Sequence, residues 1–384
     1  MATDALRDAG IRAMEKATKD FARGHNAIPD GHGEFYLASL TVALGWFENH
    51  VDTGQWQTWR ERLTTPLDKV IEGRSQKINN WRTYAMKGEW LRAQAELVDK
   101  AEAVAFIEDA WLNRTQRERI VGDAKSLYQD WNGDPQSHAV EAVGRGNLMG
   151  LVAHGYDGPS AEEIRDAVTQ GTGNALLLQD PTGQCPPNGR TDNHVFNDVL
   201  YALIFDVMAE RNWAEGNKEE AGQYRRAAQL GYGGIQRWRR NDGKWAGSFF
   251  VTKNAFDPAE RVGYQPASQY TNYNATVLFH LAEAWHTWQS DIPPSPTPAE
   301  TKSYSIEMDH AFGSVVIAAG GTQVQLNLRG DSVPKYGAYW TPLGLVRLAK
   351  SGWTAVSVRW MVITMHESDR VLAFVLPGRS GASG

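Results

Sequence analysis

The feature that most constrains the fold is a change in the spacing of apolar residues near residue 290. Before that point they recur at the three- and four-residue steps of amphipathic helices, and we expect about eleven helices of ordinary length. Beyond it they alternate, as in Tyr304, Ile306 and Met308, which is typical of strands. The chain is therefore expected to be mainly α with a C-terminal β region. The expected helices span residues 4–22, 35–49, 57–72, 79–98, 102–113, 116–130, 135–153, 160–171, 193–213, 217–240 and 273–289.

A proline-rich segment separates the two regions and predicts the domain organisation. Residues 291–298 read Asp-Ile-Pro-Pro-Ser-Pro-Thr-Pro, which is typical of a stiff linker. We expect a helical domain over residues 1–290, a linker over 291–300 and an antiparallel β-rich domain over 301–384. The β part is short for a complete sandwich, so it is either incomplete or shares a core with the helical domain.

Composition excludes several classes of protein. The net charge of −6 and the lack of a basic run interleaved with aromatic residues argue against a nucleic-acid binder. No apolar run approaches the ~20 residues of a membrane span, and the start at Met1 lacks the pattern of a signal peptide. The single Cys185 excludes an intramolecular disulfide and a cysteine-based zinc site. His25 and His32 near Glu34 match no helical metal motif, so neither metal nor cofactor is expected.

Tryptophan is unusually frequent, with fifteen in the chain. Large flat rings with a polar edge suit sugars, which are apolar on their faces and hydroxylated around the rim. Helix packing is the alternative, and we expect it for about two thirds of them. Several stand beside polar residues or glycine: Trp46, Trp56, Trp59, Trp81, Trp90, Trp131, Trp245 and Trp340.

The segment from Gly189 to His194 is the strongest candidate site. Thr191 or Asp192 is expected to cap the helix behind it, which puts Asn193 and His194 in the first turn. Free N–H groups and the helix dipole favour an anion there. Together with Arg190, these side chains would make a seat for a carboxylate. The alternative is that Asn193 only caps and His194 lies on the surface.

Other candidates lie near long connections, which are often functional. Connections over residues 171–192 and 241–272 flank this helix, and Tyr270 and Tyr273 stand where the last helix begins. A tyrosine beside a cation can transfer a proton, although packing is the usual fate of any tyrosine.

Near another helix start, Asn80, Trp81 and Arg82 offer an amide, a ring and a guanidinium, with capping by asparagine as the alternative. In the β region, His310 and a group formed by Tyr336, Tyr339 and Trp340 are weaker candidates.

Taken in order, Asn80-Trp81 with Gly88, Asn193-His194, Asp242-Gly243, the Tyr270/Tyr273 pair and a β region resemble a known group. The chain resembles the polysaccharide lyases of the heparinase II/III-like and related alginate-lyase type. The resemblance implies an α/α toroid, an incomplete helical barrel, followed by a small antiparallel β domain. It departs from the family pattern in a longer gap before the tyrosines, about residues 244–267, and in a shorter β domain.

The resemblance also implies a reaction, the β-elimination of a uronic-acid-containing glycan without a metal or cofactor. Asn193, His194 and Arg190 would neutralise the carboxylate, and Tyr270 or Tyr273 would transfer the proton. A polysaccharide or oligosaccharide is then the expected partner, in a secreted or periplasmic setting. The residues assigned to substrate binding are Asn80, Trp81, Arg82, Tyr264, Trp245, His310 and Tyr339.

Two other functions fit the same sequence. An inverting glycoside hydrolase would need two carboxylates about 6.5–9.5 Å apart, with Asp192, Asp180, Asp242 or Glu34 as candidates. A glycan-binding protein without catalysis would keep the tryptophans and lack the proton-transfer geometry.

Overall fold

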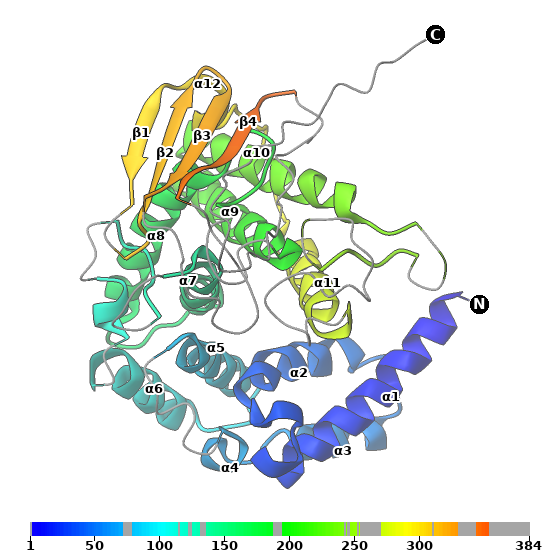
Figure 1. The fold of residues 1–384 in the computed structure, drawn as a ribbon. Coiled ribbons are helices and arrows are strands. Elements are labelled where there is room, and N and C mark those ends of the chain that lie inside the picture. Colours follow the sequence, from blue (N-terminus) through cyan, green and yellow to red (C-terminus); the bar gives the residue numbers. More distant parts are fainter. Residues whose placement is uncertain are drawn as a thin grey trace, which may run out of the picture. The chain divides into compact units, whose positions relative to one another are not determined.

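The computed structural model forms two compact units, residues 1–131 with 143–168, and residues 132–142 with 169–384 (Figure 1). Helices α7 (His138–Ala153) and α8 (Ala161–Leu178) each contribute residues to both units. The structure describes residues 2–71, 79–113, 116–121, 125–130, 136–186, 194–241, 243, 246–251, 253, 270–308, 311–328 and 343–352.

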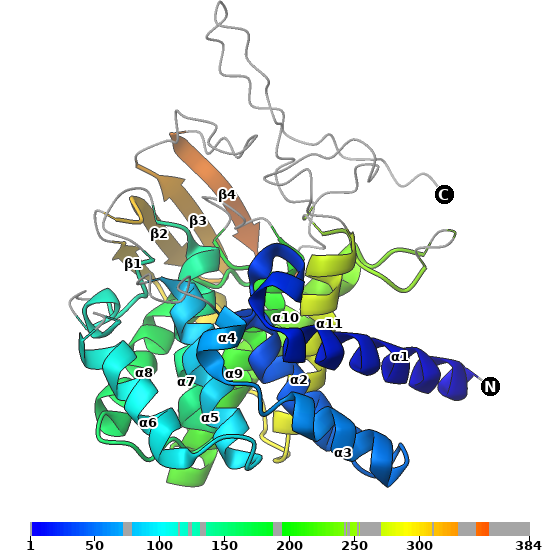
Figure 2. The ribbon, with the colours of Figure 1, turned by 90° about the horizontal axis from the view of Figure 1, so that it is seen from below.

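The first unit is built from helices that pack their apolar faces together. Its further helices are α1 (Ala2–Arg23), α2 (Glu34–Phe47), α3 (Thr53–Arg62), α4 (Leu67–Ile71), α5 (Asn80–Gln94) and α6 (Lys100–Glu108). Helix α3 runs beside α1, and α2 runs beside α5 (Figures 1 and 2). A Cβ atom at Gly88 would lie 2.2 Å from the Leu37 Cβ, so glycine lets α5 approach α2 this closely. The core contains Met14, Phe21, Leu37, Leu40, Leu44, Trp59, Leu63, Val70, Ile71 and Ala85.

Helix α9 (Val195–Glu215) is the central element of the second unit. It packs against α10 (Lys218–Ile235) and α11 (Tyr270–Thr287) and is buried on nearly all sides. Its two inward-facing acids have buried cations as partners: Asp206 binds Arg225 at 2.6 Å, and Asp198 binds Lys253 at 3.2 Å. A charge in a protein interior needs such a partner, so these pairs fix α9 to its neighbours.

The second unit ends in a four-stranded antiparallel meander, with strands in the order β1-β2-β3-β4. The strands are β1 (Tyr304–Glu307), β2 (Ser314–Ala319), β3 (Thr322–Asn327) and β4 (Gly344–Lys350). Tyr304 pairs with Ala318, Val316 pairs with Gln325, and a register shift follows Gln325 where β3 pairs with β4. The predicted class, mainly α with a C-terminal antiparallel sheet, is confirmed, while closure of the helices into a toroid stays a prediction.

The segment predicted as a linker packs along α10. Ile292, Thr297 and Ala299 are each at most 2% exposed, and α12 (Pro298–Thr301) begins inside the segment. The N–H of Ser295 donates to the Gly222 carbonyl at 2.9 Å. The domain boundary at 291–300 stays a prediction, but in the second unit this segment is a packed element.

Three predicted helices were wrong in extent or kind. Within 116–121 and 125–130 the chain has only the 3-10 turn Arg117–Arg119, and the apolar positions there include a buried Leu127 outside any helix. The helix expected over 57–72 is two helices, since Pro66 cannot donate the backbone bond that a continuous helix needs. Helix α8 continues through Gly171 and Gly173 to Leu178, so the connection expected from 171 starts at Gln179. Among the helices that the structure describes, none has the length and apolar character to cross a bilayer.

Candidate functional site

His194 leads into α9 from an extended segment. Its backbone angles, φ −84° and ψ 142°, make it the N-cap residue of α9. The N–H of the next residue, Val195, donates to the Val251 carbonyl at 2.9 Å. The expectation that His194 lies in the first turn was therefore wrong, because the backbone around residue 194 is held extended against residue 251.

The imidazole of His194 lies against the ring of Tyr273. The ring centroids are 4.6 Å apart, and the planes meet at 77°. Phe196 completes the group, stacking on Tyr273 at 5.3 Å and 17°. Tyr273 belongs to the first turn of α11 and His194 to the start of α9. Two residues that are 79 positions apart in sequence, and that both belong to the predicted site, are thus brought together.

Burial keeps His194 uncharged. The side chain is fully buried, and loss of solvation lowers its pKa to about 3, with the positive charge of Lys253 as a further cause. An uncharged His194 supplies no positive charge, so its part in neutralising a substrate carboxylate stays a prediction that depends on hydrogen bonding. A neutral imidazole still donates one hydrogen bond and accepts another.

A short segment, of which residues 249–251 and 253 are described, contacts the starts of both α9 and α11. The Asn274 side chain on α11 holds Phe249 at both backbone groups: its Oδ1 accepts the Phe249 N–H at 2.8 Å, and its Nδ2 donates to the Phe249 carbonyl at 3.0 Å. Val251 contacts α9 as described above, and Lys253 reaches Asp198 on the same helix. This segment therefore sets the spacing between His194 and Tyr273.

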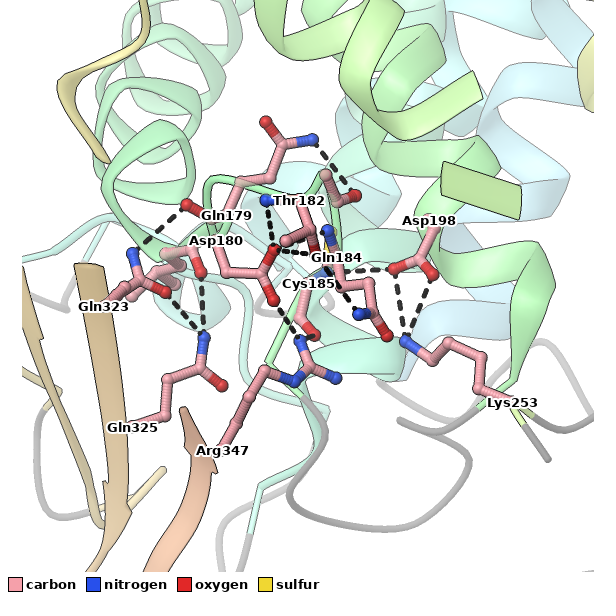
Figure 3. Close-up of polar contacts among 12 residues, drawn as sticks. Gln179, Asp180, Thr182, Gln184, Cys185, Asp198, Lys253, Gln323, Gln325 and Arg347 are labelled. Carbon is pink, nitrogen blue, oxygen red and sulfur yellow. Dashed lines mark hydrogen bonds and ion pairs between the residues drawn. The ribbon is translucent and has the colours of Figure 1, made fainter. Parts of the chain in front are cut away.

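A buried ionic network lies beside the start of α9 (Figure 3). The Lys253 ammonium lies 3.2 Å from both Asp198 carboxylate oxygens, and Asp198 Oδ1 also accepts the Cys185 N–H at 2.9 Å. Desolvation lowers the pKa of Lys253, which Asp198 partly opposes. Arg237 donates to the Thr182 carbonyl at 3.0 Å in the same loop.

Asp180 has both of its carboxylate oxygens occupied. Oδ1 accepts from the Thr182 N–H at 2.8 Å, the Thr182 hydroxyl at 2.7 Å and the Gln184 N–H at 3.1 Å. Oδ2 accepts from Arg347, which also donates to the Cys185 carbonyl at 2.6 Å (Figure 3). A buried carboxylate engaged in this way shapes a loop, and it is a poor candidate for the acid or base of a hydrolase.

The inner face of β3 is polar and caps α8. Gln323 donates to the carbonyls of Leu177 and Gln179 at 3.2 and 3.1 Å, and Gln325 donates to that of Leu178 at 3.2 Å. The Tyr304 hydroxyl donates to Leu177 at 2.8 Å. The last carbonyls of a helix lack intrahelical donors, so these side chains join the sheet to the loop that carries the ionic network.

The predicted group Asn80-Trp81-Arg82 belongs to the first unit. The Asn80 amide donates to Asp130 at 2.8 Å, and its backbone N–H does so at 2.6 Å. Arg82 is buried with its guanidinium 5.5 Å from the centre of the Phe106 ring. Trp81 remains half-buried beside His32, at 4.6 Å between ring centroids.

Several predicted residues lie outside the part of the chain that the structure describes. Tyr270 begins α11, but its side chain is not among the described ones. Of the hydrolase candidates, Asp192 and Asp242 are also outside, whereas Glu34 is buried against His32. The remaining predicted site residues that fall outside are Arg190, Asn193, Trp245, Tyr264, His310 and Tyr339.

Three residues of the site escaped the sequence argument: Asp198, Lys253 and Asn274. Asp198 did carry a signal, since it interrupts the apolar face of α9 between Val195 and Val199. A carboxylate at such a position requires a buried partner. Nothing in the pattern around Lys253 identifies it as that partner, because Lys253 comes from a segment without regular spacing. Asn274 lies in the first turns of α11, and its partner Phe249 is distant in sequence.

No protein-family model matches this chain, and no curated protein matches it. A solved structure named as a polysaccharide lyase is similar to it, with a TM-score of 0.42 and 10% sequence identity, over 65% of this chain and 72% of the other.

Proposed function

We propose that the protein is a lyase that cleaves a uronic-acid-containing polysaccharide or oligosaccharide by β-elimination. The observation that carries the proposal is the contact between the His194 and Tyr273 rings, 4.6 Å apart at the starts of α9 and α11. An imidazole beside a phenol is a combination suited to proton transfer next to a bound anion.

Local charge supports an acidic substrate. Lys253, Arg237 and Arg347 interact with Asp180 and Asp198, which gives three cations and two carboxylates in this described group, or a formal charge of 3 − 2 = +1. Because the group is largely buried, its field is weakly screened. Arg190 would add a further positive charge from the segment that precedes His194.

The reaction removes the proton at C5 of the uronate. The tyrosine acts as phenolate and takes this proton, and the C–H electron pair moves towards the carboxylate. That pair then forms the C4–C5 double bond while the C4–O bond breaks, and the tyrosine returns the proton to the leaving oxygen. Each such proton transfer typically contributes about 10²–10⁴-fold.

In this scheme His194 acts as a neutral hydrogen-bond donor. It would contact the substrate carboxylate together with the Asn193 amide, where negative charge develops in the transition state. Because the imidazole is fully buried, this contact requires the site to open when the substrate binds. The formal charge would come from Arg190 and from the buried network. Tyr273 is the first candidate for proton transfer because of its contact with His194, and Tyr270, one helical turn earlier, is the second.

Product chemistry tests the proposal. The purified protein is incubated with alginate, hyaluronan, chondroitin sulfate and heparan sulfate, and ultraviolet absorbance and new reducing ends are followed together. A lyase produces both signals, because the double bond absorbs. Reducing ends without absorbance would replace the proposal with a hydrolase, and retention of a glycan without either signal would indicate a binding protein.

Variants of Tyr273 and Tyr270 show which of the two tyrosines transfers the proton. Tyr273→Phe removes only the hydroxyl and is expected to lower kcat by about 10²–10⁴-fold with KM nearly unchanged. Tyr304→Phe is the matched control, since that hydroxyl binds the Leu177 carbonyl. Full activity of Tyr273→Phe with loss in Tyr270→Phe would move the role to Tyr270.

A further inference from the structure

Four half-exposed or exposed rings meet where α2 and α5 begin, in the first unit. The His32 imidazole stacks on Phe35 at 4.9 Å and 16°, and it meets Trp81 edge-on at 4.6 Å. Tyr84 meets Phe35 edge-on at 4.7 Å. We call His32, Phe35, Trp81 and Tyr84 the ring platform. Phe35 is 39% exposed, so the platform reaches the surface.

A buried carboxylate lies beneath the platform and orients the imidazole. His32 Nδ1 is 2.7 Å from Glu34 Oε1, and the Glu34 side chain is fully buried. When Glu34 is ionised its carboxylate only accepts hydrogen bonds, so Nδ1 carries the hydrogen, and Nε2 of an uncharged imidazole is then the acceptor. Among the described residues Nε2 has no hydrogen-bond partner, while the imidazole is 21% exposed.

Backbone packing fixes this arrangement. A Cβ atom at Gly33 would lie 2.3 Å from the Val70 carbonyl oxygen, so only glycine allows this approach between His32 and Glu34. The N–H of Phe35 donates to the His32 carbonyl at 3.2 Å, which ties His32 to the start of α2. The imidazole and the Phe35 ring are therefore held in place by the fold.

We propose that the ring platform binds a pyranose ring of a glycan. The exposed part of the Phe35 ring would contact the apolar face of the sugar, and His32 Nε2 would accept a hydrogen bond from a hydroxyl at its rim. A ligand that is apolar on one face and hydroxylated at its edge matches both elements, whereas an apolar partner surface would leave the oriented imidazole without a bond. The site belongs to the first unit and needs no turnover, so it extends beyond the proposed lyase centre.

The test measures retention of the full-length protein in native gels containing alginate, hyaluronan or the neutral glucan laminarin. Loss of the stacking ring in Phe35→Ala is expected to weaken binding about tenfold, which corresponds to one stacked ring or one good hydrogen bond. His32→Ala is expected to weaken it similarly. Trp46→Ala is the matched control, because Trp46 is on the same helix and is 37% exposed.

The outcomes separate this proposal from the lyase. Weaker retention in Phe35→Ala and His32→Ala, with Trp46→Ala unchanged, supports the platform whether or not any glycan is cleaved. Unchanged retention in both platform variants overturns it, and so does a wild-type protein that no glycan retains. Ultraviolet absorbance of the product, measured on the same samples, reports on the lyase centre independently. Circular dichroism of each variant verifies folding, and Phe35→Leu, which keeps apolar bulk without a ring, is expected to bind as weakly as Phe35→Ala.

Discussion

The Lys253 ammonium lies 3.2 Å from each carboxylate oxygen of Asp198, and both side chains are almost completely buried. Removing two charges from water costs more than their attraction returns unless every partner is present. This pair satisfies that condition through the additional Cys185 N–H on Asp198. It therefore determines how residues 249–253 lie against α9.

Loss of one partner of this pair should destabilise the protein strongly. Lys253→Met leaves the Asp198 carboxylate buried without its cation and is expected to lower the free energy of unfolding by about 3–5 kcal/mol, measured by urea denaturation. The double variant Lys253→Met with Asp198→Asn should recover much of this loss, because no charge remains buried. Lys16→Met, at an exposed ion pair on α1, should change stability by less than about 1 kcal/mol. A loss of that small size for Lys253→Met would contradict the prediction.

The stability of the protein should fall in acid partly because of His194. Its pKa is about 3 when folded and near 6.5 when unfolded, so between these values only the unfolded chain takes up the proton. Stability is then lost as pH falls from about 6.5 to about 3, with a slope of about 1.4 kcal/mol per pH unit for this group. His194→Gln removes this proton uptake, so the free energy of unfolding should depend less steeply on pH than in the wild type, by about 1.4 kcal/mol per pH unit between these values. Urea denaturation at several pH values measures this dependence. His138, whose pKa burial also lowers to about 3, provides a comparison in which His138→Gln should flatten it equally.

Asn274 should control the order of the segment beside His194. Asn274→Ala leaves the N–H and carbonyl of Phe249 without their partners and is expected to cost about 1–3 kcal/mol. Hydrogen exchange of the Phe249 amide is expected to become much faster, while the amides in the middle of α9 keep their protection. Asn212→Ala is a suitable comparison, since among the described residues that amide bonds to the Met208 carbonyl within its own helix and to the nearby Asn217. Slow exchange at Phe249 in Asn274→Ala would show that another group holds the segment.

The packing of the β-sheet against the end of α8 should be stabilised more by Gln323 than by Tyr304. Gln323→Ala removes the donors to the carbonyls of Leu177, in α8, and Gln179, directly after it, and is expected to destabilise the protein by about 1–3 kcal/mol. Tyr304→Phe removes one hydroxyl donor and should cost about 1 kcal/mol. Thermal unfolding shows which variant is destabilised more. A larger loss of stability in Tyr304→Phe than in Gln323→Ala would mean that solvent replaces the hydrogen bonds of the glutamine.

The regular spacing of apolar residues explains which parts of the fold could be predicted from the sequence. The helical period to residue 290 and the alternation after it gave the fold class, and the apolar face around Val195 to Met208 gave α9. The start of α9 was predicted at residue 193, two residues before the observed start at Val195. The reason is that the extended backbone of His194 depends on Val251, which is distant in sequence. The helix predicted over residues 116–130 was wrong for a related reason, since buried residues outside a helix, such as Leu127, add to the same apolar pattern.

The site itself was predictable only in part. His194 and Tyr273 were singled out separately, and the structure brings their rings together. The charge state of His194 could not be inferred, because its pKa follows from complete burial beside Lys253. The His32–Glu34 pair was considered only as a possible metal site, and its ring neighbours Phe35 and Trp81 become visible as a group only in three dimensions.

The proline-rich segment before the sheet, which was predicted to be a stiff linker, is packed into the second unit. Ile292 and Ala299 are buried, the Ser295 amide binds the Gly222 carbonyl, and Glu300 binds Arg226 at 2.7 Å. Asp291, Pro293, Pro294 and Pro296 are exposed, but the buried residues between and after them hold the segment against the rest of the second unit. A movement of the sheet relative to α10 would have to break these contacts first.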